Sequence, residues 1–117
     1  MSEIDKTLAG IEAKRARDEA ARRKRRDAAC AFLKSFYEKD VKRSQKLKDH
    51  GVEIAFEDGR LVLQKPAEGQ FSEGLMIVVG QQGEIDVGGK SFGRFASKDE
   101  AKTKKELIGE IILHFSL

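Results

Sequence analysis

Apolar residues recur at helical spacing along the first fifty residues of the chain. Between Ser2 and His50 there is no proline and only one glycine, Gly10. At 100° per residue, the apolar positions share one stripe of a helix; they are Ile4, Leu8, Ile11, Ala29, Phe32, Leu33, Phe36 and Leu47. The pattern predicts a long N-terminal helix over residues 2–50. Gly51 then suits the left-handed position that ends a helix.

Residues 12–27, the ionic stretch, interrupt the apolar stripe but not the helical composition. Twelve of these sixteen residues are charged and the other four are alanine. The pairs Asp18–Arg22 and Glu19–Arg23 have the spacing and order that favour a helix. We therefore divide the chain into a charged helical arm, residues 1–27, and a single α+β domain, residues 28–117.

Alternation of apolar and polar residues begins directly after Gly51 and predicts a β-hairpin over residues 52–65. Its turn is Asp58-Gly59, a favoured two-residue hairpin connection. This turn pairs Phe56 with Leu61 and places both on one apolar face. The Asp58-Gly59 turn and the alternation of apolar and polar residues therefore predict the same pairing of the two strands.

Three further short strands are predicted at residues 74–80, 84–87 and 90–95, after a loop at residues 66–73. Gly88-Gly89 provides the last hairpin turn, and Ser97 with Glu100 has the spacing of a helix-capping box. The final helix has an apolar stripe of Ala101, Leu107, Ile108, Ile111, Ile112 and Phe115. The expected fold is α+β, with a long N-terminal helix, an antiparallel β-meander of four to five strands, and a C-terminal helix packed on one sheet face.

Charge divides the chain into two unlike parts. Charged residues make up 37% of the sequence, above the quarter that is usual for globular chains. Residues 1–50 carry 15 basic and 9 acidic residues, whereas residues 51–117 carry 8 and 11. Such asymmetry suggests an anionic partner for the basic half. The candidate residues for binding it are Lys14, Arg15, Arg17, Arg22, Arg23, Lys24, Arg25 and Arg26.

The basic residues of the arm allow three interpretations. They are scattered around the helix, which is typical of a solvated spacer. They can also neutralise phosphates of a nucleic acid, with little sequence preference. An acidic protein is the third possible partner. A membrane surface is disfavoured, because a membrane-lying helix needs a large apolar face beside its basic one.

Two apolar features have no obvious place in a single core. The first is the tip of the arm, defined by Ile4, Leu8 and Ile11, which the ionic stretch separates from the body. The second is the sheet patch, defined by Val62, Met76 and Val78, which faces away from the predicted core. Because exposed apolar surface usually marks a partner, we expect these six residues to form the interface of a homo-oligomer, most simply a dimer.

The sequence contains no convincing catalytic or cofactor motif. Five residues separate Gly83 from Gly89 where a phosphate-binding loop needs four, and a strand rather than a helix is expected to follow. Neither histidine has an evident catalytic partner. Glu84 and Asp86 share a strand face, where solvated acids are the simpler interpretation. We expect no enzyme activity, no cofactor, no metal and no small-molecule substrate.

The single cysteine, Cys30, cannot form an internal disulfide, which suits a reducing compartment. No signal peptide and no membrane-spanning run is recognisable. The sequence therefore predicts a cytoplasmic, non-catalytic binding or assembly protein that acts through protein–protein contacts. A nucleic-acid-associated protein that uses its basic arm is the alternative.

Overall fold

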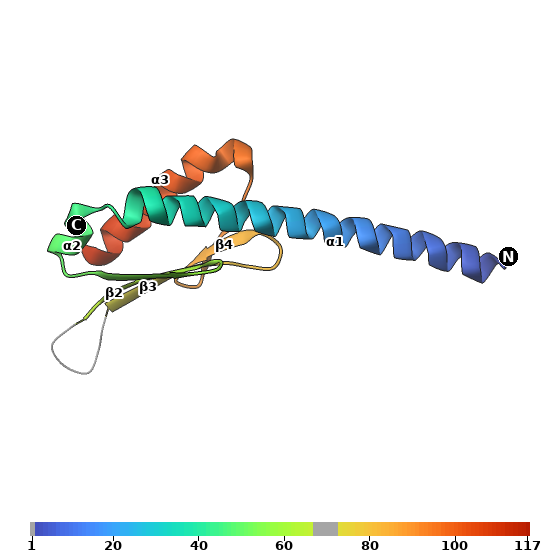
Figure 1. Ribbon diagram of the computed structural model, residues 1–117, viewed down its shortest axis with the longest axis horizontal. Helices are drawn as coiled ribbons and strands as arrows, with labels where there is room; N and C mark the ends of the chain where they lie inside the picture. Colours follow the sequence, from blue (N-terminus) through green and yellow to red (C-terminus); the bar gives the residue numbers. More distant parts are fainter. Residues whose placement is uncertain (1, 67–72) are drawn as a thin grey trace.

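The computed structural model describes residues 2–66 and 73–117. A rod-like helix runs along a small α+β body and extends beyond it, so that the N-terminus lies far from the rest of the chain (Figure 1). The molecule measures 69 × 33 × 19 Å and its radius of gyration is 19.0 Å. A compact chain of this length would have a radius of gyration of about 13 Å. The arm therefore projects from the body, as the separation of its apolar residues suggests.

The elements follow the predicted order. They are α1 (Glu3–Phe36), a π-helical turn η1 (Tyr37–Val41), α2 (Gln45–Asp49), β1 (Glu53–Glu57), β2 (Arg60–Lys65), β3 (Glu73–Val79), β4 (Glu84–Val87), β5 (Lys90–Arg94), a 3-10 turn η2 (Ser97–Asp99) and α3 (Glu100–Phe115). The five strands form one antiparallel sheet in the order β1-β2-β3-β4-β5. Helices α1 and α3 lie on the same face of this sheet (Figure 1). The predicted α+β class, β-meander and position of the C-terminal helix are confirmed.

The first hairpin has the predicted register. Phe56 pairs with Leu61 and Ile54 pairs with Leu63 across the Asp58-Gly59 turn, where Gly59 adopts a φ of +71°. The second predicted turn also forms, because Gly88 and Gly89 have φ values of +56° and +88° and connect β4 to β5. Gly88-Gly89 is therefore a hairpin turn. The strand β5 follows it, whereas a phosphate-binding loop must be followed by a helix. The loop predicted at residues 66–73 lies mostly outside the described residues.

The expectation of one helix from residue 2 to residue 50 is wrong. After Phe36 the helix widens into η1, and Ser44 starts the short helix α2 by accepting a hydrogen bond at its Oγ from the backbone N–H of Leu47. Helical periodicity did not show this break because Leu47, which is buried, falls back on the stripe of an ideal helix despite the change of direction. The end at Gly51 is as predicted: Gly51 has a φ of +73° and Val52 donates a backbone hydrogen bond to Leu47.

The last helix differs in detail from its predicted pattern. Ser97 starts a 3-10 turn instead of a capped α-helix, and no side-chain cap is formed at the start of α3. Only Leu107, Ile111 and Phe115 of its apolar stripe are buried, whereas Ala101 is exposed. The remaining isoleucines of α3 lie on its flank and stay partly accessible to solvent.

One core joins the helices to the sheet. Phe32 of α1 stacks on Phe95, which follows β5, with ring centroids 4.7 Å apart. Tyr37 of η1 stacks on Phe56 of β1 at 5.0 Å. The buried residues are Ala29, Phe32, Leu33, Phe36, Val41, Leu47, Val52, Leu61, Leu63, Leu75, Ile77, Val79, Ile85, Val87, Phe95, Leu107, Ile111 and Phe115. All of them belong to residues 28–117; the division of the chain after residue 27 into arm and domain stays a prediction.

We expect α1 to be essential for stability only where it meets this core. Replacing Leu33, which is fully buried, with alanine should lower the free energy of unfolding by about 2–5 kcal/mol through lost burial and a residual cavity. The matched change at its exposed neighbour, Lys34→Ala, should alter the free energy of unfolding by less than about 0.5 kcal/mol. Urea unfolding followed by circular dichroism measures both. Equal effects would contradict the described packing of α1.

Candidate functional site

The tip of the arm is an exposed apolar stripe at the end of a capped helix. Ser2 caps α1 by accepting a hydrogen bond at its Oγ from the backbone N–H of Asp5 at 3.1 Å. The exposed fractions are 78% for Ile4, 48% for Leu8 and 43% for Ile11. These three residues have the i, i+4, i+7 spacing of one helix face. The tip thus presents apolar side chains to solvent on a helix that is already formed.

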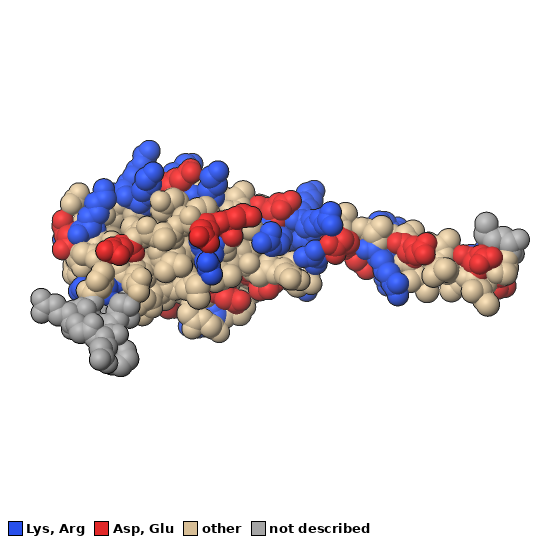
Figure 2. All heavy atoms as spheres, turned by 60° about the horizontal axis from the view of Figure 1, so that its bottom comes forward, with Lys and Arg blue, Asp and Glu red and all other residues tan. Residues whose placement is uncertain are grey.

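Beyond the tip, the arm is exposed through residue 21. Glu19 forms ion pairs with Arg22 and Arg23 on the same helix. The hydrogen bond from Arg22 is the main reason that the pKa of Glu19 falls to about 2. Figure 2 shows positive and negative groups alternating along the arm, without a continuous positive strip. The expectation of i,i+4 pairs is met in part, because Glu19 contacts Arg23, while Arg22 pairs with Glu19 and not with Asp18.

The base of the arm touches the end of the sheet. Arg22 Nη1 donates a hydrogen bond of 2.9 Å to the backbone oxygen of Gln81, and Arg25 Nη2 donates one of 3.4 Å to Gln82 Oε1. Both glutamines lie in the turn between β3 and β4. Gly83 of that turn has a φ of +79°, and a Cβ atom there would lie 3.0 Å from backbone atoms of Arg25. The last turns of the ionic stretch therefore contact the body, which a fully solvated spacer would not do.

The eight candidate residues for an anionic partner fall into two groups. Arg22, Arg25 and Arg26 are partly buried at the base of the arm. The others are exposed and point into solvent around the helix; they are Lys14, Arg15, Arg17, Arg23 and Lys24. Arg22, Arg23 and Arg26 also line a shallow hollow together with Asp27 and Gln81. The structure thus brings Arg22, Arg23 and Arg26 together around one hollow, while Arg25 contacts the β3–β4 turn and the other four stay exposed along the arm.

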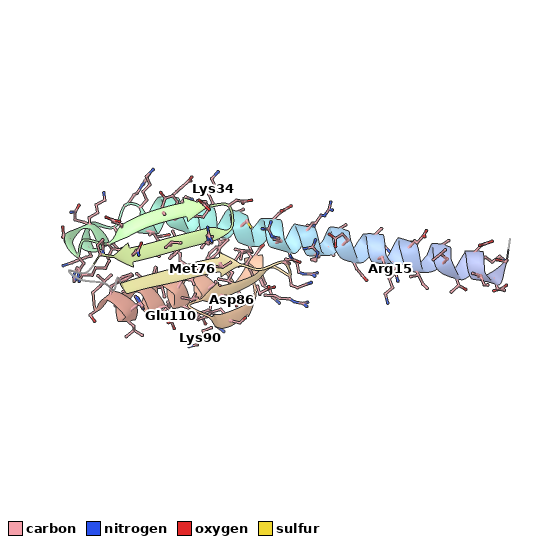
Figure 3. All side chains as sticks on the ribbon, turned by 90° about the horizontal axis from the view of Figure 1, so that it is seen from below. Arg15, Lys34, Met76, Asp86, Lys90 and Glu110 are labelled. Atoms are coloured by element: carbon pink, nitrogen blue, oxygen red, sulfur yellow. The ribbon has the colours of Figure 1, made fainter. Side chains whose placement is uncertain are left out.

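The sheet patch lies on the sheet face opposite the helices. Met76 is 45% exposed, and Val62 and Val78 are half-buried. Val62 pairs with Met76 across β2 and β3, whereas Val78 lies between Arg60 and Asp86. Figure 3 shows Met76 and Asp86 on the sheet side that faces the viewer. The patch is present as predicted, but charged neighbours limit its apolar area.

An apolar concavity between helices was missed by the sequence analysis. This α3 groove has a volume of about 380 Å³ and lies between α3 and the segment formed by the end of α1, η1 and α2. Its apolar lining consists of Phe36, Val41, Leu47, Ile108, Ile111, Ile112 and Leu117. The sequence held one signal for this groove: α3 carries more apolar residues than one packed face can bury. The surplus residues are Ile108, Ile112 and Leu113, which remain exposed.

Two ion pairs fix the position of α3 beside this groove. Lys104 Nζ lies 3.1 Å from Asp40 Oδ2 of η1, and Lys90 Nζ lies 3.7 Å from Glu110 Oε1. Figure 3 shows Lys90 and Glu110 near the same edge of the sheet. These contacts attach α3 to η1 on one side and to β5 on the other.

The side chains that could take part in catalysis include carboxylates, two histidines and one cysteine. Within residues 2–66 and 73–117, no group of three or more His, Cys, Asp or Glu side chains is placed to hold a metal ion. Glu84 accepts a hydrogen bond from the backbone N–H of Gln82, which gives this carboxylate a structural role in the β3–β4 turn. Burial raises the pKa of the Cys30 thiol, which disfavours the reactive thiolate. No described helix has the length and apolar character needed to cross a membrane.

Comparison with known proteins gives no relative for this chain. No family model matches it, and no curated protein or solved structure matches it either. Functional inference therefore rests on the surfaces described above.

The contact between Gly83 and Arg25 should determine how firmly the arm is attached. We expect Gly83→Ala to lower the free energy of unfolding by at least about 1 kcal/mol more than Gly93→Ala, because the added Cβ crowds the α1 backbone. Gly93 is the matched control: its φ is +80°, but nothing lies within 4 Å of its added Cβ. Both variants share the cost of left-handed backbone, about 1–2 kcal/mol. Urea unfolding compares them, and equal losses would contradict a tight contact.

Proposed function

We propose that this chain is a small, non-catalytic assembly protein that acts through protein–protein contacts and forms a homodimer. The observation that supports this proposal best is the exposed tip, three apolar side chains on a preformed helix far from the core of its own chain. Exposed apolar surface of this kind usually marks an interaction site. The sheet patch is a second candidate surface. The free, partly buried Cys30 fits a cytoplasmic location for such a protein.

The proposal that the protein is not an enzyme follows from the arrangement of its reactive side chains. Catalysis by general acids and bases needs partnered groups within hydrogen-bonding reach of one another. His50 follows α2 and His114 is near the end of α3, and His114 contacts the ring of Phe115. Neither belongs to a described cluster of potential metal ligands. Binding therefore explains the exposed surfaces better than catalysis does.

The assembly proposal is tested by solution mass. Light scattering at micromolar concentration should give about 26 kDa, twice the mass of the 13.1 kDa chain. The double variant Leu8→Glu/Ile11→Glu should dissociate the dimer if the tip is the interface, and Val62→Glu/Val78→Glu should do so if the sheet patch is. The matched control Ala9→Glu/Ala13→Glu adds the same charge to the opposite face of the helix and should leave the dimer intact. A wild-type mass of one chain would contradict the proposal.

A nucleic-acid partner is the second candidate function, favoured by the exposed basic residues of the arm. Lys14, Arg15, Arg17 and Lys24 form no salt bridge with any residue that the structure describes. Arg22, Arg23 and Arg26 add three guanidinium groups around one hollow at the base of the arm. An exposed helix with free cationic side chains can follow a phosphate backbone. An acidic protein would be recognised by the same charges.

Salt dependence tests the nucleic-acid candidate. If it is right, affinity for duplex DNA or RNA should fall steeply between about 50 and 200 mM salt. Replacing Arg15, Arg17, Arg23 and Lys24 with glutamine should reduce the slope of log affinity against log salt by up to about four units. The same number of charges removed from the body, at Arg94, Lys98, Lys102 and Lys105, should leave the slope unchanged. Absence of binding at low salt would exclude this function.

A further inference from the structure

We infer that the α3 groove is the binding site for the tip of α1 from a second copy of this chain, an inference that rests on the proposed assembly function. The groove is a concave apolar surface, and the tip is an exposed apolar face at the end of a helix. A helix that docks in an apolar groove does so through anchors at i, i+4 and i+7. Ile4, Leu8 and Ile11 supply that spacing, and seven of the ten residues that line the groove are apolar.

Charge complementarity supports this pairing. Residues 2–13, which contain the tip, carry three acidic residues, Glu3, Asp5 and Glu12, and one basic residue, Lys6. The acid in the groove, Asp40, already pairs with Lys104, whereas the lysine in the groove, Lys46, forms no salt bridge with the residues that the structure describes. A separate hollow, which shares no lining residue with the groove, is lined by Glu38, Lys42, Arg43 and Lys48. The net negative tip would thus meet a groove whose one acid is already paired and whose lysine is available for an ion pair.

The tip of the same chain cannot occupy the groove. Leu8 and Phe36 lie on one continuous helix, 28 residues apart, which corresponds to about 42 Å. The tip would have to break α1 to fold back onto its own body. The tip of a second chain meets no such restriction, so the geometry selects a second copy over the chain itself.

The length of the arm also fits a symmetric pair. If two α1 helices run antiparallel with Leu8 of one level with Phe36 of the other, the reverse contact forms automatically, as two-fold symmetry requires. The two helices are then level at residue 22, where α1 leaves the body. The exposed part of each arm, residues 3–21, spans about 28 Å and would lie along the partner's body.

The charges of the ionic stretch are compatible with this register. Counting outward from residue 22, Asp18 of one helix is level with Arg26 of the other, and Arg17 is level with Asp27. Opposite charges at the same level favour the antiparallel arrangement over a parallel one, in which like residues would face each other. In such a dimer the ionic stretch of each chain would lie beside the ionic stretch of the other.

Adjacent residues of α3 provide the first test. Ile112 lines the groove and is 42% exposed, whereas Leu113 is 78% exposed and lies outside the lining. Ile112→Glu should raise the dissociation constant of the dimer at least about 100-fold, because it places a charge opposite the apolar tip. Leu113→Glu should leave the dissociation constant within about threefold of wild type. Light scattering over a dilution series measures both, and circular dichroism verifies that each variant is folded.

Cysteine pairing provides a second test that does not depend on the stability of Ile112→Glu. In a Cys30→Ser background, chains with Leu8→Cys are mixed with chains carrying Ile112→Cys and oxidised gently. A disulfide-linked band at twice the chain mass should form in the mixture and in neither chain alone, since the two tips of an antiparallel pair lie at opposite ends.

The outcomes separate the two proposals. Cross-linking of Leu8→Cys chains with one another would show tip-to-tip pairing and overturn the groove as the acceptor. A dimer that Val62→Glu/Val78→Glu dissociates, and that Ile112→Glu does not, would also overturn the groove while keeping the assembly function. A wild-type mass of one chain at all micromolar concentrations would overturn both.

Discussion

Everything distinctive about this molecule depends on one rigid connection: a single α-helix is packed on the sheet at one end and free at the other. The packed end is held by Ala29, Phe32, Leu33 and Phe36, which fill the core between α1 and the strands. The free end is exposed to solvent through residue 21. Because the helix is continuous, the position of the tip is determined by packing about 40 Å away.

The base of the arm strengthens this connection. Arg22 and Arg25 extend the contact of α1 beyond the apolar core to the β3–β4 turn, and Gly83 allows the helix backbone to approach that turn closely. These are polar contacts at the edge of the body, where the ionic stretch supplies long side chains that reach the turn. Arg22 and Arg25 of the ionic stretch thus anchor the base of the arm. The exposed basic residues further along remain available for a partner.

The sequence was most informative where two independent signals agreed. The Asp58-Gly59 turn and the alternation around it predicted the register of β1 and β2 residue by residue, and Gly88-Gly89 predicted the last turn. Helical periodicity predicted the projecting arm but not the break after η1, because Leu47 falls back on the stripe of an ideal helix after the change of direction. The contact of Arg25 with Gly83 was unpredictable from composition, since charged residues at helical spacing look solvated. The α3 groove depends on how α3, η1 and α2 meet in space, which pattern alone does not encode.

The continuity of α1 has a further consequence for how the chain can change during evolution. Each residue added to the arm rotates the tip by about 100° around the helix axis and advances it by about 1.5 Å. An insertion of one residue would therefore turn the apolar face of the tip away from its present direction. An insertion of seven residues would restore the direction to within about 20° and lengthen the arm by about 10 Å. The arm consequently defines an angle as well as a distance, so insertions that keep the direction of the tip are those that complete nearly whole turns, such as about 7, 11 or 18 residues.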